Sequence, residues 1–294
     1  MSAYGYSVVD DPAAHQVVLF GGIDDYDNTW LWNGQRWTLA RPGASPPGRF
    51  DAAAAYDPVT RQVMVYGGRL GPGEVVCDTW AWTGTTWVEL EKGSSQLPAG
   101  EFAQMAWDAT RREMVLVTPT DTALETWVWK SGWVRQPDGD LDATNTGGLG
   151  LDPTSGSLLL LASGSAAGAG STWPWDGSAW RRVSGPPPPS AGWIAIDPLS
   201  GRLLLLGYFS PSQPAPAIWT WSGAGWSLMP GSTVASIGPS EIATDVGHWR
   251  LLLFGSLAGS TQSAPLPVRI WAWTGDHGSD WTDARGVEVG SRTA

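Results

Sequence analysis

The sequence predicts an all-β protein, a six-bladed β-propeller of four-stranded antiparallel blades. One phrase, Trp-x-Trp with a glycine shortly after it, recurs along the whole chain, and its first tryptophans are Trp30, Trp80, Trp127, Trp173, Trp219 and Trp271. A turn built on an aspartate, such as Asp57-Pro58, precedes each copy and leads into an apolar run. Repeats of this length with several short strands each are typical of propellers. Because the six units fill all 294 residues, we expect residues 1–294 to form a single domain.

Each unit predicts four strands in a fixed order. In the second unit, a first strand of small residues (52–56) ends at Asp57-Pro58, where proline presets φ and the aspartate can bond the backbone ahead. An apolar second strand (62–66) follows and ends in Gly67-Gly68. The third strand carries Trp-x-Trp, whose two rings share one face because side chains alternate along a strand. A tight glycine turn then leads to a fourth strand that begins with another tryptophan, Trp87. We expect the first strands to be innermost, since small residues suit six strands that converge on an axis.

These motifs resemble those of kelch-repeat propellers, the family that includes the central domain of galactose oxidase. The double glycine after the second strand stands at Gly21-Gly22 and Gly67-Gly68 and is lost in later units. The resemblance implies a propeller of kelch-like blades but no particular function, since propellers of this family include enzymes, ligand binders and adaptors. The copper site of galactose oxidase requires two histidines, a tyrosine ligand and a tyrosine–cysteine crosslink. Here His15, His248 and His277 fall in turns on the face opposite the mouth of the central channel that we propose below as the ligand site. We therefore expect no cofactor.

The net charge and the cysteine content exclude some classes of binding partner and of structural crosslink. The chain has 17 basic and 28 acidic residues, a net charge of −11, which argues against nucleic acid and against an anionic membrane as partners. A lone cysteine, Cys77, excludes a disulfide framework. We place Cys77 in a loop, where the negative charges of Glu74 and Asp78 raise the pKa of its thiol, so we expect no reactive cysteine.

The N-terminal sequence and the lengths of the apolar runs bear on localisation. The N-terminus has no basic stretch followed by an apolar segment, and the longest apolar runs fall short of the roughly 20 residues of a membrane span. We therefore expect a cytoplasmic protein, or an extracellular one if a leader has been removed. We also expect a monomer. Since the first and last units each have four strands of their own, the ring needs no strand exchange between the termini.

Most of the 21 tryptophans are predicted to pack between blades. Three positions per repeat account for all of them except Trp107, Trp193 and Trp249. A residue that obeys the symmetry of the scaffold is better explained by packing than by ligand stacking. The three exceptions are therefore better ligand candidates, and Trp193 stands out because other units place small residues in that strand.

Departures from the repeat also point to a ligand site at one mouth of the central channel, where the first strands begin. The candidate catalytic residues are Glu101, Asp51 and Tyr6, and the candidate ligand-binding residues are Tyr4, Arg49, Gln104, Asn145, Trp193 and Glu241. Alternatively, these residues cap strand ends and hydrate the channel. Arg49, in Pro-Pro-Gly-Arg, also matches a kelch position at which the resemblance implies a structural hydrogen-bonding arginine.

Loop lengths give a second indication. The loops between second and third strands are long in the fifth and sixth units (207–217 and 255–269) and carry several prolines. Long loops on a rigid scaffold often carry function. The acidic loop of the first unit, Asp24-Asp25-Tyr26-Asp27, has carboxylates of the kind that bind Ca²⁺, although such residues are more often simply solvated. We predict no metal site.

Two function classes remain. The first is a binding module that presents its loop-rich mouth to a small molecule, a glycan or a protein. The second is a small-molecule enzyme, an isomerase, lyase, cyclase or hydrolase, with Glu101 or Asp51 as general acid or base and Arg49 stabilising negative charge. The thin catalytic inventory favours the first.

Overall fold

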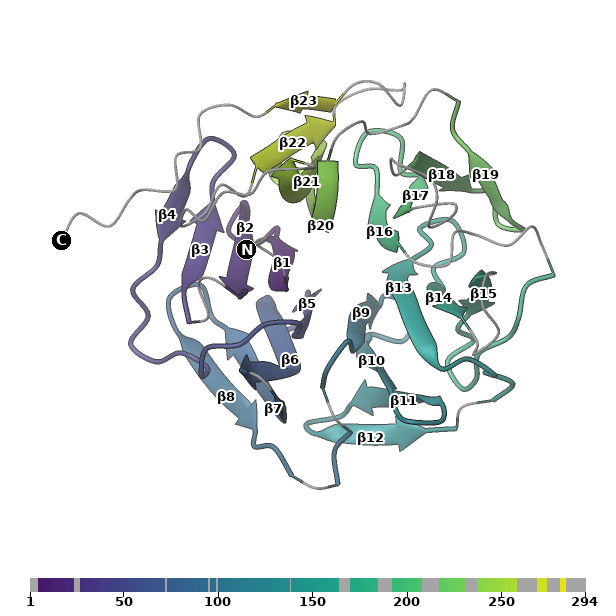
Figure 1. Ribbon diagram of the computed structural model, residues 1–294, viewed down its shortest axis with the longest axis horizontal. Coiled ribbons are helices and arrows are strands. Elements are labelled where there is room, and N and C mark those ends of the chain that lie inside the picture. The colour runs from purple at the N-terminus through teal and green to yellow at the C-terminus, as the bar shows by residue number, and fades with distance from the viewer. Residues whose placement is uncertain are drawn as a thin grey trace.

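The computed structural model confirms the predicted architecture of six antiparallel sheets around a central axis (Figure 1). It describes residues 5–23, 27–71, 73–94, 96–98, 100–137, 139–163, 170–184, 192–207, 217–230, 237–257, 269–273 and 281–283. The predicted loops 207–217 and 255–269 fall largely outside these ranges, so what they contribute stays a prediction.

The strands of blades 1 to 3 are β1 (Tyr6–Asp11), β2 (Gln16–Gly21), β3 (Thr29–Trp32), β4 (Trp37–Leu39), β5 (Ala53–Asp57), β6 (Gln62–Gly71), β7 (Glu74–Trp82), β8 (Trp87–Glu91), β9 (Gln104–Asp108), β10 (Glu113–Pro119), β11 (Leu124–Trp129) and β12 (Trp133–Gln136). Those of blades 4 to 6 are β13 (Asn145–Leu151), β14 (Leu158–Ser163), β15 (Gly170–Pro174), β16 (Gly192–Ile196), β17 (Leu203–Gly207), β18 (Ala217–Trp221), β19 (Trp226–Leu228), β20 (Ile237–Asp245), β21 (Arg250–Leu257), β22 (Arg269–Trp273) and β23 (Trp281–Asp283). A 3₁₀ turn, η1 (Val246–His248), precedes β21. Among the described residues there is no helix of the length and apolar character that a membrane span requires.

Strands pair in sequence order within every blade, with the first strand innermost, as predicted. Blade 4 has a reduced fourth strand. Its outer segment forms one bridge, Trp175 to Trp180, and the amides of Arg181 and Val183 then donate to Pro174 and Thr172. The ring closes as expected, because β1 to β4 and β20 to β23 each come from contiguous chain.

The repeated tryptophans of the described blades are largely buried, which confirms their packing role. Trp82, Trp87, Trp173, Trp175 and Trp180 are at most 1% exposed. The indole N–H of the fourth-strand tryptophan also bonds a threonine of the preceding blade at four junctions. These pairs are Trp87 to Thr29, Trp133 to Thr79, Trp180 to Thr126 and Trp226 to Thr172, at 2.7 to 3.0 Å.

The turn aspartates act as predicted. All six are buried, and the carboxylate of Asp57 accepts the amide of Val59 at 2.8 Å and the hydroxyl of Thr60 at 2.8 Å. Similar bonds form at Asp108, Asp152 and Asp197. The first five aspartates thus fix the start of the turn by bonding backbone amides two or three residues ahead. The carboxylate of Asp245 is bonded instead by the side chains of His248 and Arg250.

The double glycines allow the chain entering the next blade to cross closely. Gly22, with φ of +96°, donates its amide to Arg49 O at 2.9 Å, and a Cβ there would lie 2.2 Å from the Tyr6 ring. Gly68, with φ of +94°, donates to Gly100 O, and its Cβ would lie 2.7 Å from Phe50 O. Only glycine fits both the left-handed backbone and the close approach.

Candidate functional site

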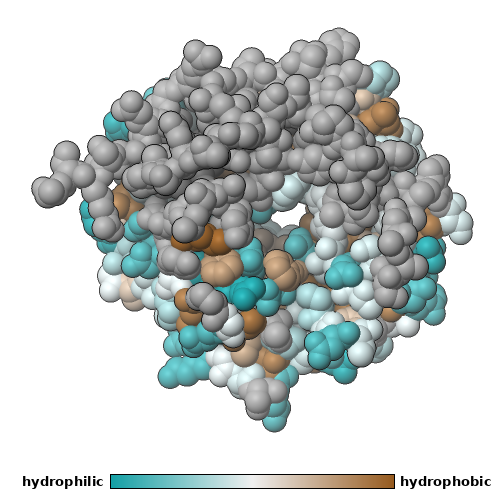
Figure 2. Space-filling view, viewed as in Figure 1, coloured by the Kyte–Doolittle hydropathy of each residue, from teal (hydrophilic) through white to brown (hydrophobic). Residues whose placement is uncertain are grey.

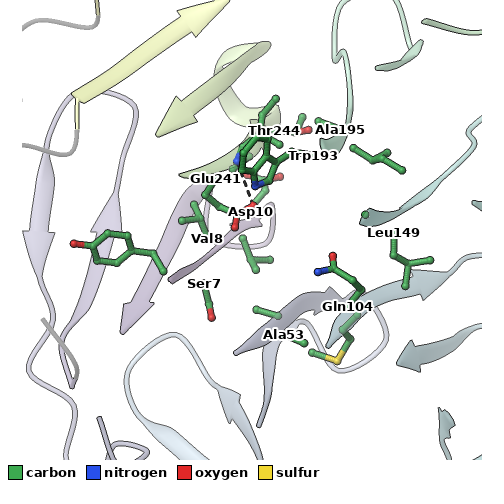
Figure 3. Close-up of a pocket in the computed structure, with 18 of the residues that line it drawn as sticks. Ser7, Val8, Asp10, Ala53, Gln104, Leu149, Trp193, Ala195, Glu241 and Thr244 are labelled. Atoms are coloured by element: carbon green, nitrogen blue, oxygen red, sulfur yellow. Dashed lines mark hydrogen bonds between the residues drawn. The ribbon is translucent and has the colours of Figure 1, made fainter. Parts of the chain in front are cut away.

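The first strands of all six blades enclose a cavity of about 580 Å³ in the central channel. Figure 2 shows the channel opening near the centre of the molecule, and Figure 3 shows the side chains that surround it. The walls are mostly small and apolar, as the composition of the first strands predicts. A few polar and aromatic side chains interrupt them, and these define the candidate site.

Strand register stacks the lining residues in layers. Ser7, counted four residues before the turn aspartate Asp11, pairs with Phe20, and the equivalent residues of the other blades pair with the equivalent positions of their second strands. We call this set the Glu241 layer: Ser7, Ala53, Gln104, Gly148, Trp193 and Glu241. The layer therefore holds most of the polar and aromatic side chains near the mouth, with Gln104 across the channel from Glu241 (Figure 3).

Two further layers lie deeper in the channel. Next to the Glu241 layer is an apolar layer of Val8, Ala54, Met105, Leu149, Ile194 and Ile242. Near the opposite end, one residue before the turn aspartates, the cavity is lined by Asp10, Tyr56 and Thr244, which we call the Asp10 layer. The channel is thus polar towards both ends and apolar between them.

Glu241 enters the channel from β20, where the register shifts between Pro239 and Glu241. A bulge of this kind redirects the side chains on either side of it. Burial raises the pKa of Glu241 to about 8, and a hydrogen bond from the Ile242 amide at 3.2 Å offsets this only in part. Although part of its surface faces the channel, protein atoms surround the carboxyl closely. At neutral pH it is therefore mostly protonated.

Asp10 is the second perturbed carboxyl of the cavity. Burial raises its pKa to about 7, and the negative charges of Asp245 and Asp11 add to the shift, while the Val246 amide opposes it. The causes differ from those at Glu241, because like charges contribute at Asp10. Both groups titrate near neutral pH.

Trp193 supplies the largest side chain of the Glu241 layer. It packs against a cluster in blades 5 and 6 that includes Ile242 and Leu251, and it lines the cavity as predicted. The other two tryptophans outside the repeat do not line it. Trp107 packs with the cluster around Met105, and Trp249 is 60% exposed beside η1.

A charged cluster stands where β5 and β9 begin, at the mouth. Arg69 donates to Glu101 at 2.5 Å and lies 5.6 Å from the centre of the Phe50 ring. Burial and the charge of Glu101 raise the pKa of Asp51, against the opposing charge of Arg69. Asp51 and Phe102 both have left-handed backbones, with φ of 55° and 56°, and Phe102 is 55% exposed.

The structure separates the predicted site residues other than Arg49 into three groups. Tyr6, Gln104, Trp193 and Glu241 line the cavity together. Asp51, Glu101 and Asn145 stand at strand beginnings and are not among the described residues that line it. Tyr4 lies outside the described residues.

The structure places Arg49 outside the described lining of the channel, whereas the sequence analysis expected it to face a ligand there. Its side chain is fully buried, and its guanidinium donates to both carboxylate oxygens of Asp78, at 2.5 and 2.9 Å, and to Pro47 O and Gly67 O. Burial would raise the pKa of Asp78, but Arg49 holds it below its usual value. The arginine therefore joins backbone segments, which agrees with the structural role that the kelch resemblance implies.

Cys77 lies within β7 rather than in a loop, because β6 and β7 continue as a long hairpin to Gly71 and Glu74. Its thiol donates to Ser94 O at 3.3 Å. Burial raises its pKa, with Asp78 and Glu91 adding to the shift, in the predicted direction. Among the described residues, no three His, Cys, Asp or Glu side chains gather as metal ligands. Asp24 and Asp25 lie outside those residues, so a Ca²⁺ site there stays untested.

Among the lining residues that the sequence analysis did not name as candidates are Asp10 and Tyr56. Because Asp10 directly precedes the turn aspartate Asp11, the sequence suggests that both belong to the turn. Both Asp10 and Tyr56 come directly before a turn aspartate. This shared position in the repeat is the signal that could have identified them, because the layers of the channel follow the distance from the turn aspartate.

Comparisons with known proteins support the fold. No protein-family model matches the sequence, and no curated protein matches it. Among solved structures, the chain is similar to YjhT, with 14% identity and a TM-score of 0.64 over 96% of this chain and 97% of the other. It is also similar to a mutant of Aleuria aurantia lectin in complex with Fucα1-6GlcNAc, with 13% identity and a TM-score of 0.59 over 95% and 94% of the two chains. A GH74 enzyme of Niastella koreensis matches with 14% identity and a TM-score of 0.61 over 96% of this chain and 46% of the enzyme. At such identities the likeness establishes a six-bladed β-propeller fold.

Proposed function

We propose that this protein is a kelch-type propeller, formed by the whole chain, that binds a small molecule in its central channel. The observation that carries the proposal is the cavity of about 580 Å³. Ligand pockets have volumes of roughly 300 to 1,000 Å³ and combine apolar walls with a few polar groups. The layered lining of this channel has that composition. A cavity of this size suits a small molecule better than a protein or a large glycan.

The kelch assignment rests on the double glycines and on Arg49. Gly22 and Gly68 let the incoming segment of the next blade cross within hydrogen-bonding distance. Arg49 ties Gly67 O to Asp78. Both features support a kelch-like junction between blades.

A thermal-shift screen of metabolites, followed by calorimetry of each hit, tests the binding site. A channel ligand should stabilise the wild type and lose at least tenfold in affinity on Trp193→Ala or Glu241→Gln. The matched controls are Trp249→Ala, which removes an exposed tryptophan beside η1, and Glu74→Gln, which removes an exposed carboxyl at the tip of the β6–β7 hairpin. Hits that bind all four variants equally would place binding outside the channel and overturn the proposal.

One observation favours an enzyme as the second candidate. Glu241 is mostly protonated at neutral pH because burial raises its pKa to about 8, and enzymes use carboxyls of this kind as general acids. In that case, Glu241→Gln abolishes turnover of a hit while much of its binding remains. Binding without any product in the wild type would reject the enzyme.

A further inference from the structure

The charged groups of the channel all carry one sign. Of the described residues that line the cavity, Asp10 and Glu241 are acidic, and none is lysine, arginine or histidine. The arginines near the two ends are already bonded: Arg69 is paired with Glu101 at the mouth, and Arg61 bonds the hydroxyl of Tyr56 at the other end. An anionic ligand would thus meet two carboxyls and no lining cation. A cationic ligand would supply the positive charge that no lining side chain offers to the two carboxyls.

Aromatic side chains accompany both carboxyls. Trp193 lies in the Glu241 layer, Tyr56 lies in the Asp10 layer, and Tyr6 lines the cavity at the mouth. Ammonium groups are attracted to the faces of such rings, most strongly to tryptophan. Each end of the cavity therefore offers a carboxyl and an aromatic ring, the usual surroundings of a bound ammonium group.

The spacing of the carboxyls sets the length of the ligand. Glu241 stands four residues before the turn aspartate of its strand, and Asp10 stands one residue before the turn aspartate of the adjacent first strand. Their positions along the channel axis therefore differ by three residues, and three residues of a strand span about 10 Å. Between them lies the apolar layer, including Met105, Leu149 and Ile194. A chain of methylene groups could cover this layer without leaving a polar atom unpaired.

We propose that the channel ligand is a linear aliphatic diamine that carries one ammonium group at each end. The proposal rests on the binding function proposed above and names its ligand class. One ammonium pairs with Glu241 beside Trp193, the methylene chain lies along the apolar layer, and the other ammonium pairs with Asp10 beside Tyr56.

Binding is coupled to proton release. Asp10 faces Asp245 of β20 and neighbours Asp11 on its own strand, while the Val246 amide donates to it; the Glu241 carboxyl has the Ile242 amide as its described partner. Since burial raises both pKa values, to about 7 for Asp10 and about 8 for Glu241, at pH 7 Glu241 is mostly protonated and Asp10 about half protonated. An incoming ammonium group favours the ionised form, so the complex forms with release of protons.

Calorimetry with hexamethylenediamine tests the proposal, with hexylamine, hexanediol and adipate as probes of similar length. We expect the diamine to bind at least tenfold more tightly than hexylamine, and the diol and adipate not to saturate. In Asp10→Asn and in Glu241→Gln the diamine should bind no more tightly than hexylamine, because one charged contact is gone in each. Glu74→Gln should leave its affinity unchanged. Two buffers of different ionisation enthalpy should report proton release at pH 7.

The outcomes separate the two proposals. Equal affinity for diamine and hexylamine, or equal loss in Glu74→Gln, shows attraction to the acidic surface and overturns the diamine. If the diol or adipate binds more tightly than the diamine and Trp193→Ala weakens that binding, the diamine proposal is overturned but the channel remains a binding site. If no probe or screened metabolite responds to Trp193→Ala, the binding function fails as well. Thermal unfolding of each variant confirms that it is folded.

Discussion

The indole N–H of Trp87 in blade 2 donates to the hydroxyl of Thr29 in blade 1 at 2.9 Å, and both side chains are at most 1% exposed. The same bond joins blades 2 and 3, 3 and 4, and 4 and 5. The corresponding positions of blades 5 and 6 are Ile218 and Ile270, whose side chains have no acceptor. The ring is therefore joined at four junctions by a buried polar bond that its last two junctions cannot form.

Thr29→Val should lower the free energy of unfolding by about 1–3 kcal/mol, because valine keeps the shape of threonine but leaves the buried Trp87 indole N–H without its acceptor. Urea unfolding measures the change. Thr38→Val, at an exposed position of β4, is the control and should lie within about 0.5 kcal/mol of the wild type. Equal effects of the two substitutions would show that the inter-blade bond contributes nothing.

Arg49→Ala should destabilise the protein by about 3–5 kcal/mol, since it removes a fully buried guanidinium that bonds two backbone carbonyls and leaves the partly buried Asp78 carboxylate with the Trp80 indole N–H as its remaining side-chain donor. The double variant Arg49→Met with Asp78→Leu should recover much of this loss, because it removes both charges. Ligand affinity should not change in whichever of these variants remains folded. A selective loss of affinity in a stable Arg49 variant would return this residue to the binding site.

Gly34→Ala should weaken the junction between blades 6 and 1. Gly34 has φ of +90°, and a Cβ there would lie 1.9 Å from the His248 ring, which sits 2.9 Å from Asp245. Gly34 O also accepts from Arg250 at 2.6 Å. Gly84 is the matched control, since its φ is +93° and nothing lies within 4 Å of the added Cβ.

We therefore expect Gly84→Ala to cost about 1–2 kcal/mol for the left-handed backbone alone, and Gly34→Ala to cost more in the same urea titration. Adding His248→Ala should remove the excess at Gly34 and leave the cost at Gly84 as it was. If the two glycines respond alike in the wild-type background, the closeness of His248 has no energetic consequence.

Stability should fall as the pH rises from about 4 to about 8. A carboxyl titrates near pH 4 in the unfolded chain, whereas burial raises the folded-state pKa of Asp10 to about 7 and that of Glu241 to about 8. Across this window the folded state holds more protons, so raising the pH favours unfolding. Below pH 4 both states are protonated and the contribution is complete.

Glu241→Gln removes one of these groups and should flatten the slope between pH 5 and pH 9. Because one pKa unit corresponds to about 1.4 kcal/mol and the channel admits solvent, we expect the variant to be about 1–3 kcal/mol more stable than the wild type at pH 9. Urea titrations at pH 5, 7 and 9 measure the slope, with Glu74→Gln as the control. A slope identical to that of the wild type would show that Glu241 ionises normally.

Some residues that line the cavity could be picked out from the sequence and others could not. Trp193 and Glu241 break a pattern of small residues, and a break in a repeat is visible in sequence. Asp10 and Arg49 gave no such signal. Asp10 resembles its turn neighbour Asp11. Arg49 lies in the segment that leads into β5, where the sequence alone does not show whether a side chain is exposed or buried. Its burial depends on contacts with Gly67 and Asp78, which are distant in the chain.

The amino-acid sequence by itself determined the number of blades, the order of their strands and the chemistry of their turns, because all three arise from local preferences repeated along the chain. The tertiary structure alone decided which side chains meet. Convergence of six first strands brings Asp10 and Glu241, 231 positions apart in the chain, into one cavity, and burial there changes their protonation. Burial and convergence depend on the whole ring, so no single repeat encodes them.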